Sequence, residues 1–452
     1  MQKFNWLNRR FIRILAWLFG GLCLIIIGIS VVWLPPILSF GFLGISILIG
    51  ILLMKPHWLL ISLLLLRSSA DSAQDLFILF PGSWYSFNAA GLLNILACFV
   101  GIFIIARRFA RGKRILPSIP LIIFSLFLIV GAIGIMVSID MPASVKSWTR
   151  FAGYLGIALL ALEVTANKMA IRKTLLAIII TAVPQLILGY YQSATGSGYF
   201  FPGFLDSQFA YRPSGTFGHP AILASFLITI ICLTLSTFLL NSSFMPRLLI
   251  GVLIVACLGL LVLTFARSEW IGGIIAFGVI VFIRSKKLII IGILAGLLIL
   301  AFLPAVQDRI SGEEASTTLD WRLAVWDASL KVLEQPTVIG YGLDTSPILV
   351  NRELVNVIAP PHNDYLRNAI ETGVVGLMFF LLLQGALVFH GWQAYNSSNK
   401  DLIRVMGLSL LGITIGGIAI SLTDNYFSYV SVQWYNWTII GLLSANSAFR
   451  IT

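Results

Sequence analysis

Two arginines and one histidine lie at the ends of apolar segments, next to glycines, prolines or predicted helix starts. Arg212 lies in the segment YRPSGTFGHP, Arg267 in LTFARSEW and His362 in PPHNDYL. Arginine forks bind phosphate oxygens, and a neutral histidine can take a proton from a hydroxyl group. These residue types therefore suit a reaction in which a phosphate or diphosphate is neutralised while a base activates an acceptor hydroxyl.

Each of these residues also has a structural interpretation. An arginine at the end of a span, such as Arg212, also snorkels to the membrane interface. Arg267 also fits a tight turn in which it pairs with Glu269, and His219 fits a packing or hydrogen-bonding role. His362 fits an N-cap or an interface residue as well as a base that the positive end of a helix keeps neutral. The residues by themselves leave both interpretations open.

The composition excludes a soluble enzyme. The chain has 452 residues, 58% hydrophobic and 11% charged, with a mean hydropathy of +0.96, whereas soluble domains carry roughly 25% charged residues. Apolar stretches long enough to cross a hydrocarbon core recur along the whole chain. We therefore predict an all-α, polytopic helical bundle with about 12–14 transmembrane helices. The expected crossings lie near 12–33, 37–54, 57–69, 88–106, 119–138, 150–166, 172–191, 220–240, 247–265, 268–283, 287–303, 371–391, 403–422 and 431–448.

The charges predict the orientation of the bundle. The formal net charge is +12 and the pI is near 9.7, which in a soluble protein would suggest a nucleic-acid partner. With the N-terminus in the cytoplasm, however, 20 of the 30 basic residues and only Glu163 and Asp401 among the 18 acidic ones fall on the inside. This distribution satisfies the positive-inside rule. We expect both termini in the cytoplasm, a retained N-terminal anchor and no nucleic-acid partner.

The chain divides into three expected parts. Residues 1–303 form a transmembrane bundle with an outer loop at 193–218, residues 304–370 form a large outer loop, and residues 371–452 form the C-terminal transmembrane helices. Within the large loop an apolar pattern at three- and four-residue spacings predicts an amphipathic helix on the membrane surface, with a capping pattern at its start and a proline after it. The pattern consists of Leu319, Leu323, Trp326, Leu330 and Leu333, with Thr317 and Asp320 at the start and Pro336 at the end.

Several common site types have no counterpart in the sequence. The four cysteines lie inside apolar runs without metal-ligand spacing, so a disulfide framework or a zinc site is not expected. No P-loop, GxGxxG, GxSxG or DxD motif is present. We therefore expect no cofactor, no metal and no nucleotide-driven step.

Four segments in order resemble the O-antigen ligase and polymerase superfamily of bacteria. They are RPSGTFGHP, TFARSEW, a tryptophan and proline followed by GYG, and PHNDYL followed by ETG, and they cover roughly residues 200 to 380. The resemblance implies an inner-membrane glycosyltransferase of the cell envelope that takes a glycan from undecaprenyl pyrophosphate on the periplasmic side. It implies that Arg212 and Arg267 bind the pyrophosphate and that His362 activates the acceptor, with inversion at the anomeric carbon and without a metal. His219, Asn363, Asp364 and Tyr365 fall in the same motifs and are implied to bind substrate or to orient the histidine.

The resemblance leaves the acceptor open among lipid A core, as in lipopolysaccharide, a growing polysaccharide and a protein. Members of the superfamily typically have about 12 crossings, which puts the boundaries near 57–69 and 268–283 in question. The alternatives are a transporter or lipid-linked glycan flippase, a bicarbonate-related role included, and a noncatalytic scaffold. Transporters usually carry ionisable groups near mid-membrane and related halves, and neither feature is evident in this sequence. A scaffold would not need the outer arginines.

Overall fold

The computed structural model describes residues 55–72, 88–165, 168–201, 209–240, 245–285, 307–309, 313–335, 337–354, 359–398 and 400–445. In these ranges the only strands are β1 (Tyr199–Phe200) and β2 (Tyr211–Arg212), which pair antiparallel, so the all-α prediction is confirmed. The expected crossings near 12–33, 37–54 and 287–303 lie outside the described residues. The helices are α3 (Pro56–Ala70), α4 (Ala89–Ala110), α5 (Ile119–Met136), α6 (Met141–Val164), α7 (Lys168–Ile180), α8 (Ala182–Thr195), α9 (Pro220–Leu239), α10 (Arg247–Leu263), α11 (Arg267–Arg284), α14 (Glu313–Leu333), α15 (Ser346–Glu353), α16 (Asp364–Ser397), α17 (Asp401–Ile420), η2 (Tyr426–Ser428) and α18 (Val430–Ser444).

Six described helical stretches are long and apolar enough to cross a membrane. They are α4, α5, α7 together with α8, α9, α16 and α17, and α10 is a shorter apolar helix. With 22 residues, α4 is roughly 33 Å long at about 1.5 Å per residue, which matches a hydrocarbon core of about 30 Å. The chain is therefore a multi-pass membrane protein.

Polar side chains cap the helices where the apolar runs begin. The Asn88 side chain accepts a hydrogen bond from the Gly91 N–H at the start of α4. The Asp140 side chain accepts one from the Ala143 N–H at the start of α6. A side-chain oxygen at this position satisfies a backbone N–H that has no partner within the helix. The sequence thus marks these helix starts locally.

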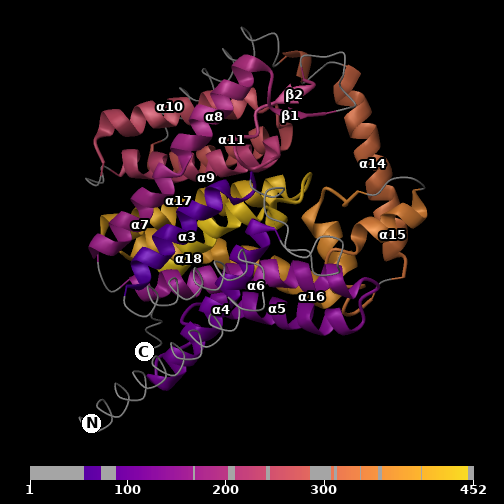
Figure 1. The fold of residues 1–452 in the computed structure, drawn as a ribbon, viewed down its shortest axis with the longest axis horizontal. Coiled ribbons are helices and arrows are strands. Elements are labelled where there is room, and N and C mark those ends of the chain that lie inside the picture. Colours follow the sequence, from indigo (N-terminus) through magenta and orange to yellow (C-terminus); the bar gives the residue numbers. More distant parts are fainter. Residues whose placement is uncertain are drawn as a thin grey trace, which may run out of the picture.

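The helices pack side by side as a bundle. Figure 1 shows α10 and α11 on one side, α4 and α5 on the opposite side, and α17 and α18 between them. The helices α11 and α17 approach each other closely, since a Cβ on Gly416 would lie 2.6 Å from the Gly272 carbonyl oxygen. Small residues at such a crossing let two membrane helices approach closely. This contact ties α11, which carries Arg267, to the C-terminal helices.

The helix α14 lies across one end of the bundle together with α15, as Figure 1 shows. It begins at Glu313, upstream of the start that the capping pattern predicts. Val325 and Ala328 are buried, whereas Leu319, Leu323 and Leu330 are about half exposed. The helix therefore presents an apolar edge outward. Its contact with a membrane surface stays a prediction.

Candidate functional site

A break in α16 sets the position of the PHNDYL segment. At Gly373 the backbone has φ +66 and ψ −169, a conformation open essentially to glycine alone. The break leaves two carbonyl groups without a partner in the helix, and the GYG segment binds them. The Tyr341 N–H donates to the Ile370 oxygen and the Gly342 N–H to the Glu371 oxygen, both at 3.0 Å. The GYG and ETG motifs are therefore joined by backbone hydrogen bonds.

His362 lies just before this short helical segment, with a backbone φ of +47. Such values are uncommon outside glycine, although histidine adopts them more readily than most residues. The Trp326 Nε1–H of α14 donates to the Pro361 carbonyl oxygen at 2.9 Å, and the Trp321 ring meets the His362 ring edge-on at a centroid distance of 5.4 Å. Two tryptophans of α14 thus fix the backbone and the ring at this position.

Asp424 is the direct partner of His362. Its Oδ1 lies 3.1 Å from the His362 Nδ1, and the Asp424 side chain is only 9% exposed. Burial alone would raise the pKa of Asp424, but the hydrogen bond with His362, the charges of His362 and Arg322 and the Asn425 N–H together lower it to about 2. Because a carboxylate can only accept, Nδ1 is the nitrogen that carries a proton toward Asp424. In the neutral form of this ring, Nε2 is therefore the basic nitrogen.

The first motif brings Arg212 and His219 to the same region. Arg212 is buried on β2, where its Nε–H donates to the Phe209 oxygen at 3.1 Å and its guanidinium lies 4.2 Å from the Phe201 ring centroid. His219 is the N-cap of α9 and accepts from the Ala221 N–H at 3.3 Å.

Electrostatics joins these two residues to His362. Burial lowers the pKa of His219; the charge of Asp424 opposes this, while those of His362 and Arg212 add to it. Asp424, His362 and Arg212 therefore all lie within electrostatic range of His219. The structure brings Arg212 and His219 toward the His362–Asp424 pair.

The second motif forms the tight turn between α10 and α11. Phe265 has a φ of +51, and Arg267 is the first residue of α11 and is half-buried. The next residue, Ser268, accepts a hydrogen bond at its Oγ from the Arg322 guanidinium of α14 at 3.2 Å. Arg322 also acts on Asp424 through its charge. The turn that carries Arg267 thus borders the His362 region through Arg322.

The remaining predicted residues connect this region to the link between α17 and α18. The Asn363 side chain caps α16 through the Tyr365 and Leu366 N–H groups, and its amide donates to the Leu422 oxygen at 2.9 Å. Asp364 Oδ2 accepts from the Ser421 hydroxyl and the Phe427 N–H, each at 2.8 Å. The Tyr365 hydroxyl donates to the Ile418 oxygen at 3.1 Å.

All three of these residues face protein partners on α17 or on the link that follows it. Their contacts support a role in orienting His362, because that link carries Asp424. They offer less support for direct binding of substrate.

Sequence reasoning missed Asp424 and Arg322. Asp424 was visible only as an acidic residue in a short outer turn between two predicted spans. Arg322 was visible only as a charged residue on an amphipathic helix. The available signal for both was a charged group on the outer side near apolar neighbours, where desolvation is costly.

A buried ion network was also missed. Arg367 donates to Glu371 at 2.9 Å, to Asp344 at 2.7 Å and to the Ser428 hydroxyl at 2.8 Å, and the Ser346 hydroxyl donates to Glu371 at 2.6 Å. Arg367 and Glu371 are almost fully buried. The network ties the loop after GYG to α16 and to the link before α18, so it stabilises the frame around His362.

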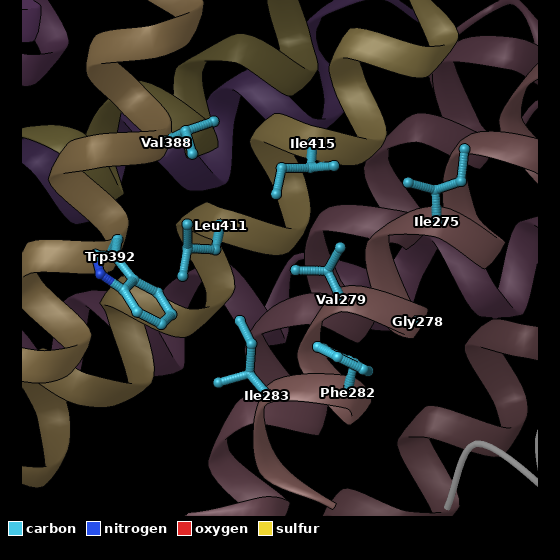
Figure 2. A pocket seen from close by; sticks show the side chains of 9 residues that line it. All are labelled: Ile275, Gly278, Val279, Phe282, Ile283, Val388, Trp392, Leu411 and Ile415. Carbon is cyan, nitrogen blue, oxygen red and sulfur yellow. The ribbon is translucent and has the colours of Figure 1, made fainter. Parts of the chain in front are cut away.

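The apolar groove in Figure 2 lies elsewhere. It has a volume of about 530 Å³ and is lined by apolar side chains of α11, α16 and α17, among them Ile283, Trp392 and Leu411. Ile283 lies at the end of α11 opposite to Arg267. A second groove of about 930 Å³ is lined mainly by α10 and includes Arg247 at its start. Neither groove is lined by a residue of the His362 region, so the polar chemistry lies away from both.

Among the described residues, no three histidine, cysteine, aspartate or glutamate side chains form a group that could hold a metal ion.

A comparison with protein families places this geometry in context. No curated protein matches the chain. Residues 252–381 match the family model described as O-antigen ligase. The match runs from α10 into α16 and contains Arg267, Arg322 and His362, while Arg212, His219 and Asp424 lie outside it. The resemblance seen in the motifs is thereby confirmed, and this part of the chain is similar to O-antigen ligases.

Proposed function

We propose that this protein transfers a glycan from undecaprenyl pyrophosphate to an acceptor hydroxyl on the outer face of the bacterial inner membrane, without a metal. The observation that carries the proposal is the His362–Asp424 pair, with a contact of 3.1 Å next to buried arginine and histidine side chains. The family match supports a membrane glycosyltransferase of the ligase type. The outer location is supported by the distribution of basic residues, which predicts cytoplasmic termini.

His362 acts as the general base. Its Nε2 takes the proton from the acceptor hydroxyl as that oxygen attacks the anomeric carbon of the donor glycan. The bond from this carbon to the pyrophosphate oxygen breaks at the same time, and undecaprenyl pyrophosphate leaves with the electron pair. Asp424 stabilises the imidazolium that forms and holds the ring in the productive tautomer. Direct displacement inverts the anomeric carbon.

Three arginines hold the diphosphate in this proposal. Arg212 is buried beside an aromatic ring, and Arg267 and Arg322 border the turn before α11. Guanidinium groups bind phosphate oxygens in forks, and in a site shielded from water they stabilise the charge of the leaving group. These arginines supply the charge that a metal ion supplies in other transferases. The acceptor is a sugar of lipid A core or of a growing polysaccharide, or a protein hydroxyl.

A reconstituted transfer assay tests the proposal. Purified protein in liposomes receives an undecaprenyl-pyrophosphate-linked glycan and a panel of these acceptors, with a chelator present. We expect transfer that resists the chelator and falls by about 10²- to 10⁴-fold in His362→Ala, which is the usual contribution of a general base. His57→Ala is the matched control, since His57 lies in the first turn of α3 and none of its contacts within the described residues involves the His362 region.

Wild-type turnover in His362→Ala would remove the assigned base. Transfer that stops with the chelator would exclude the metal-independent mechanism. Absence of transfer with every acceptor, combined with accumulation of the glycan lipid in intact vesicles, would favour a transporter instead.

A further inference from the structure

Glu269 is a buried acid that the proposed mechanism does not use. It lies in the first turn of α11, two residues after Arg267, and is 1% exposed. Within the described part of the chain its Oε1 has no hydrogen-bond partner. A buried polar atom without a partner costs free energy, so its presence calls for a compensating role.

The neighbours of Glu269 are the groups of the candidate site. Asp424 and Arg322 act on it through their charges, and Tyr429 lies close enough to interact with both Glu269 and Asp424. The negative charge of this acidic pair is held on Asp424 by its contact with His362. Two buried carboxyl groups close together do not both ionise readily, so Glu269 keeps its proton. A neutral carboxyl group offers one O–H donor and one acceptor oxygen.

We infer that Glu269 binds a hydroxyl group of the glycan beside the His362–Asp424 pair. This inference rests on the proposed function. A sugar hydroxyl is also one donor and one acceptor, so it complements a neutral carboxyl group, whereas the anionic diphosphate is drawn to the arginines.

Arg322 covers the site in the structure, since its guanidinium bonds the Ser268 hydroxyl of the same turn. Glu269 is almost fully buried, so this turn has to move before a glycan reaches the carboxyl group.

Lipid binding separates this role from the chemistry of transfer. The protein in nanodiscs is titrated with undecaprenyl pyrophosphate and with the same lipid carrying an N-acetylhexosamine disaccharide. Glu269→Ala should weaken the binding of the glycan lipid about tenfold, equal to about 1.4 kcal/mol, and leave the binding of the bare lipid unchanged. Glu269→Gln, which keeps a donor and an acceptor without a charge, should recover most of the affinity. Unchanged binding of the bare lipid also shows that the Glu269→Ala variant is folded.

Glu334→Ala is the matched control, because this glutamate is exposed near the end of α14. Equal weakening of both lipids, or of neither, in Glu269→Ala would overturn the inference. An equal loss of affinity for the glycan lipid in Glu269→Gln and Glu269→Ala would contradict the statement that the Glu269 carboxyl group binds in its neutral form. If Glu269→Ala weakens the binding of the glycan lipid alone but the wild-type protein transfers no glycan, the proposed transfer is refuted and the sugar contact stands. If the wild-type protein binds both lipids equally well, the sugar contact alone is refuted.

Discussion

Replacing Asp424 with asparagine tests the pairing that the structure places behind His362. The substitution keeps the size of the side chain and removes its charge. Lowering the Asp424 pKa from 3.8 to about 2 corresponds to about 2 kcal/mol in favour of the charged carboxyl group. The same interaction stabilises the imidazolium that forms during transfer. An asparagine amide can also donate to Nδ1, which would select the wrong tautomer.

The expected result is a fall in kcat of about 10²- to 10⁴-fold, because the wrong tautomer removes the basic nitrogen of the histidine. The KM for the glycan lipid should change little, because Asp424 does not touch the donor in this mechanism. In a His362→Ala background the Asp424→Asn change should have no further effect, since the two residues act as one unit. Asp327→Asn is the control, because that carboxylate is 66% exposed on α14. Wild-type kcat in Asp424→Asn, or an equal fall in the His362→Ala background, would refute the reasoning.

The same pair predicts a dependence of stability on pH. The folded-state pKa of Asp424 lies below the unfolded value, so its stabilising contribution is complete above about pH 4 and is lost as the pH falls toward about 2. The melting temperature of the wild type should therefore fall more steeply between about pH 4 and about pH 2 than that of Asp424→Asn. Parallel curves for the two proteins would contradict the lowered pKa.

Two further predictions concern the frame of the site. Gly373→Ala should lower the free energy of unfolding by at least about 1–3 kcal/mol, because φ is +66 and a Cβ would lie 2.5 Å from a carbonyl oxygen. The control is Gly385→Ala, in open space on the same helix. It should be neutral or stabilising in the same thermal unfolding assay. Glu371→Ala should lower the free energy of unfolding by about 3–5 kcal/mol, because it leaves Arg367 buried with one carboxylate fewer. Its control, Glu353→Ala at an exposed site, should shift the unfolding midpoint little. Equal shifts in the two variants would argue against the ion network.

Local sequence was sufficient for most of the helices. The expected crossings between residues 57 and 283 and between 371 and 448 correspond to helices of the structure, because a long apolar run has few alternatives to a helix in a membrane. The run at 172–191 is divided into α7 and α8 at Thr181. The turn before α11 was also predictable, because the charged residues Arg267 and Glu269 interrupt an apolar run.

The sequence by itself determined the membrane class, the helix positions, the expected orientation and the motifs, because each depends on the composition of short segments. The tertiary structure alone decided which charged groups meet. Asp424 reaches His362 across 62 residues because Asn363 and Asp364 bind the link after α17. Arg322 reaches the turn before α11 because α14 lies across the bundle. Such contacts depend on how helices cross and break, which no periodicity within one segment records.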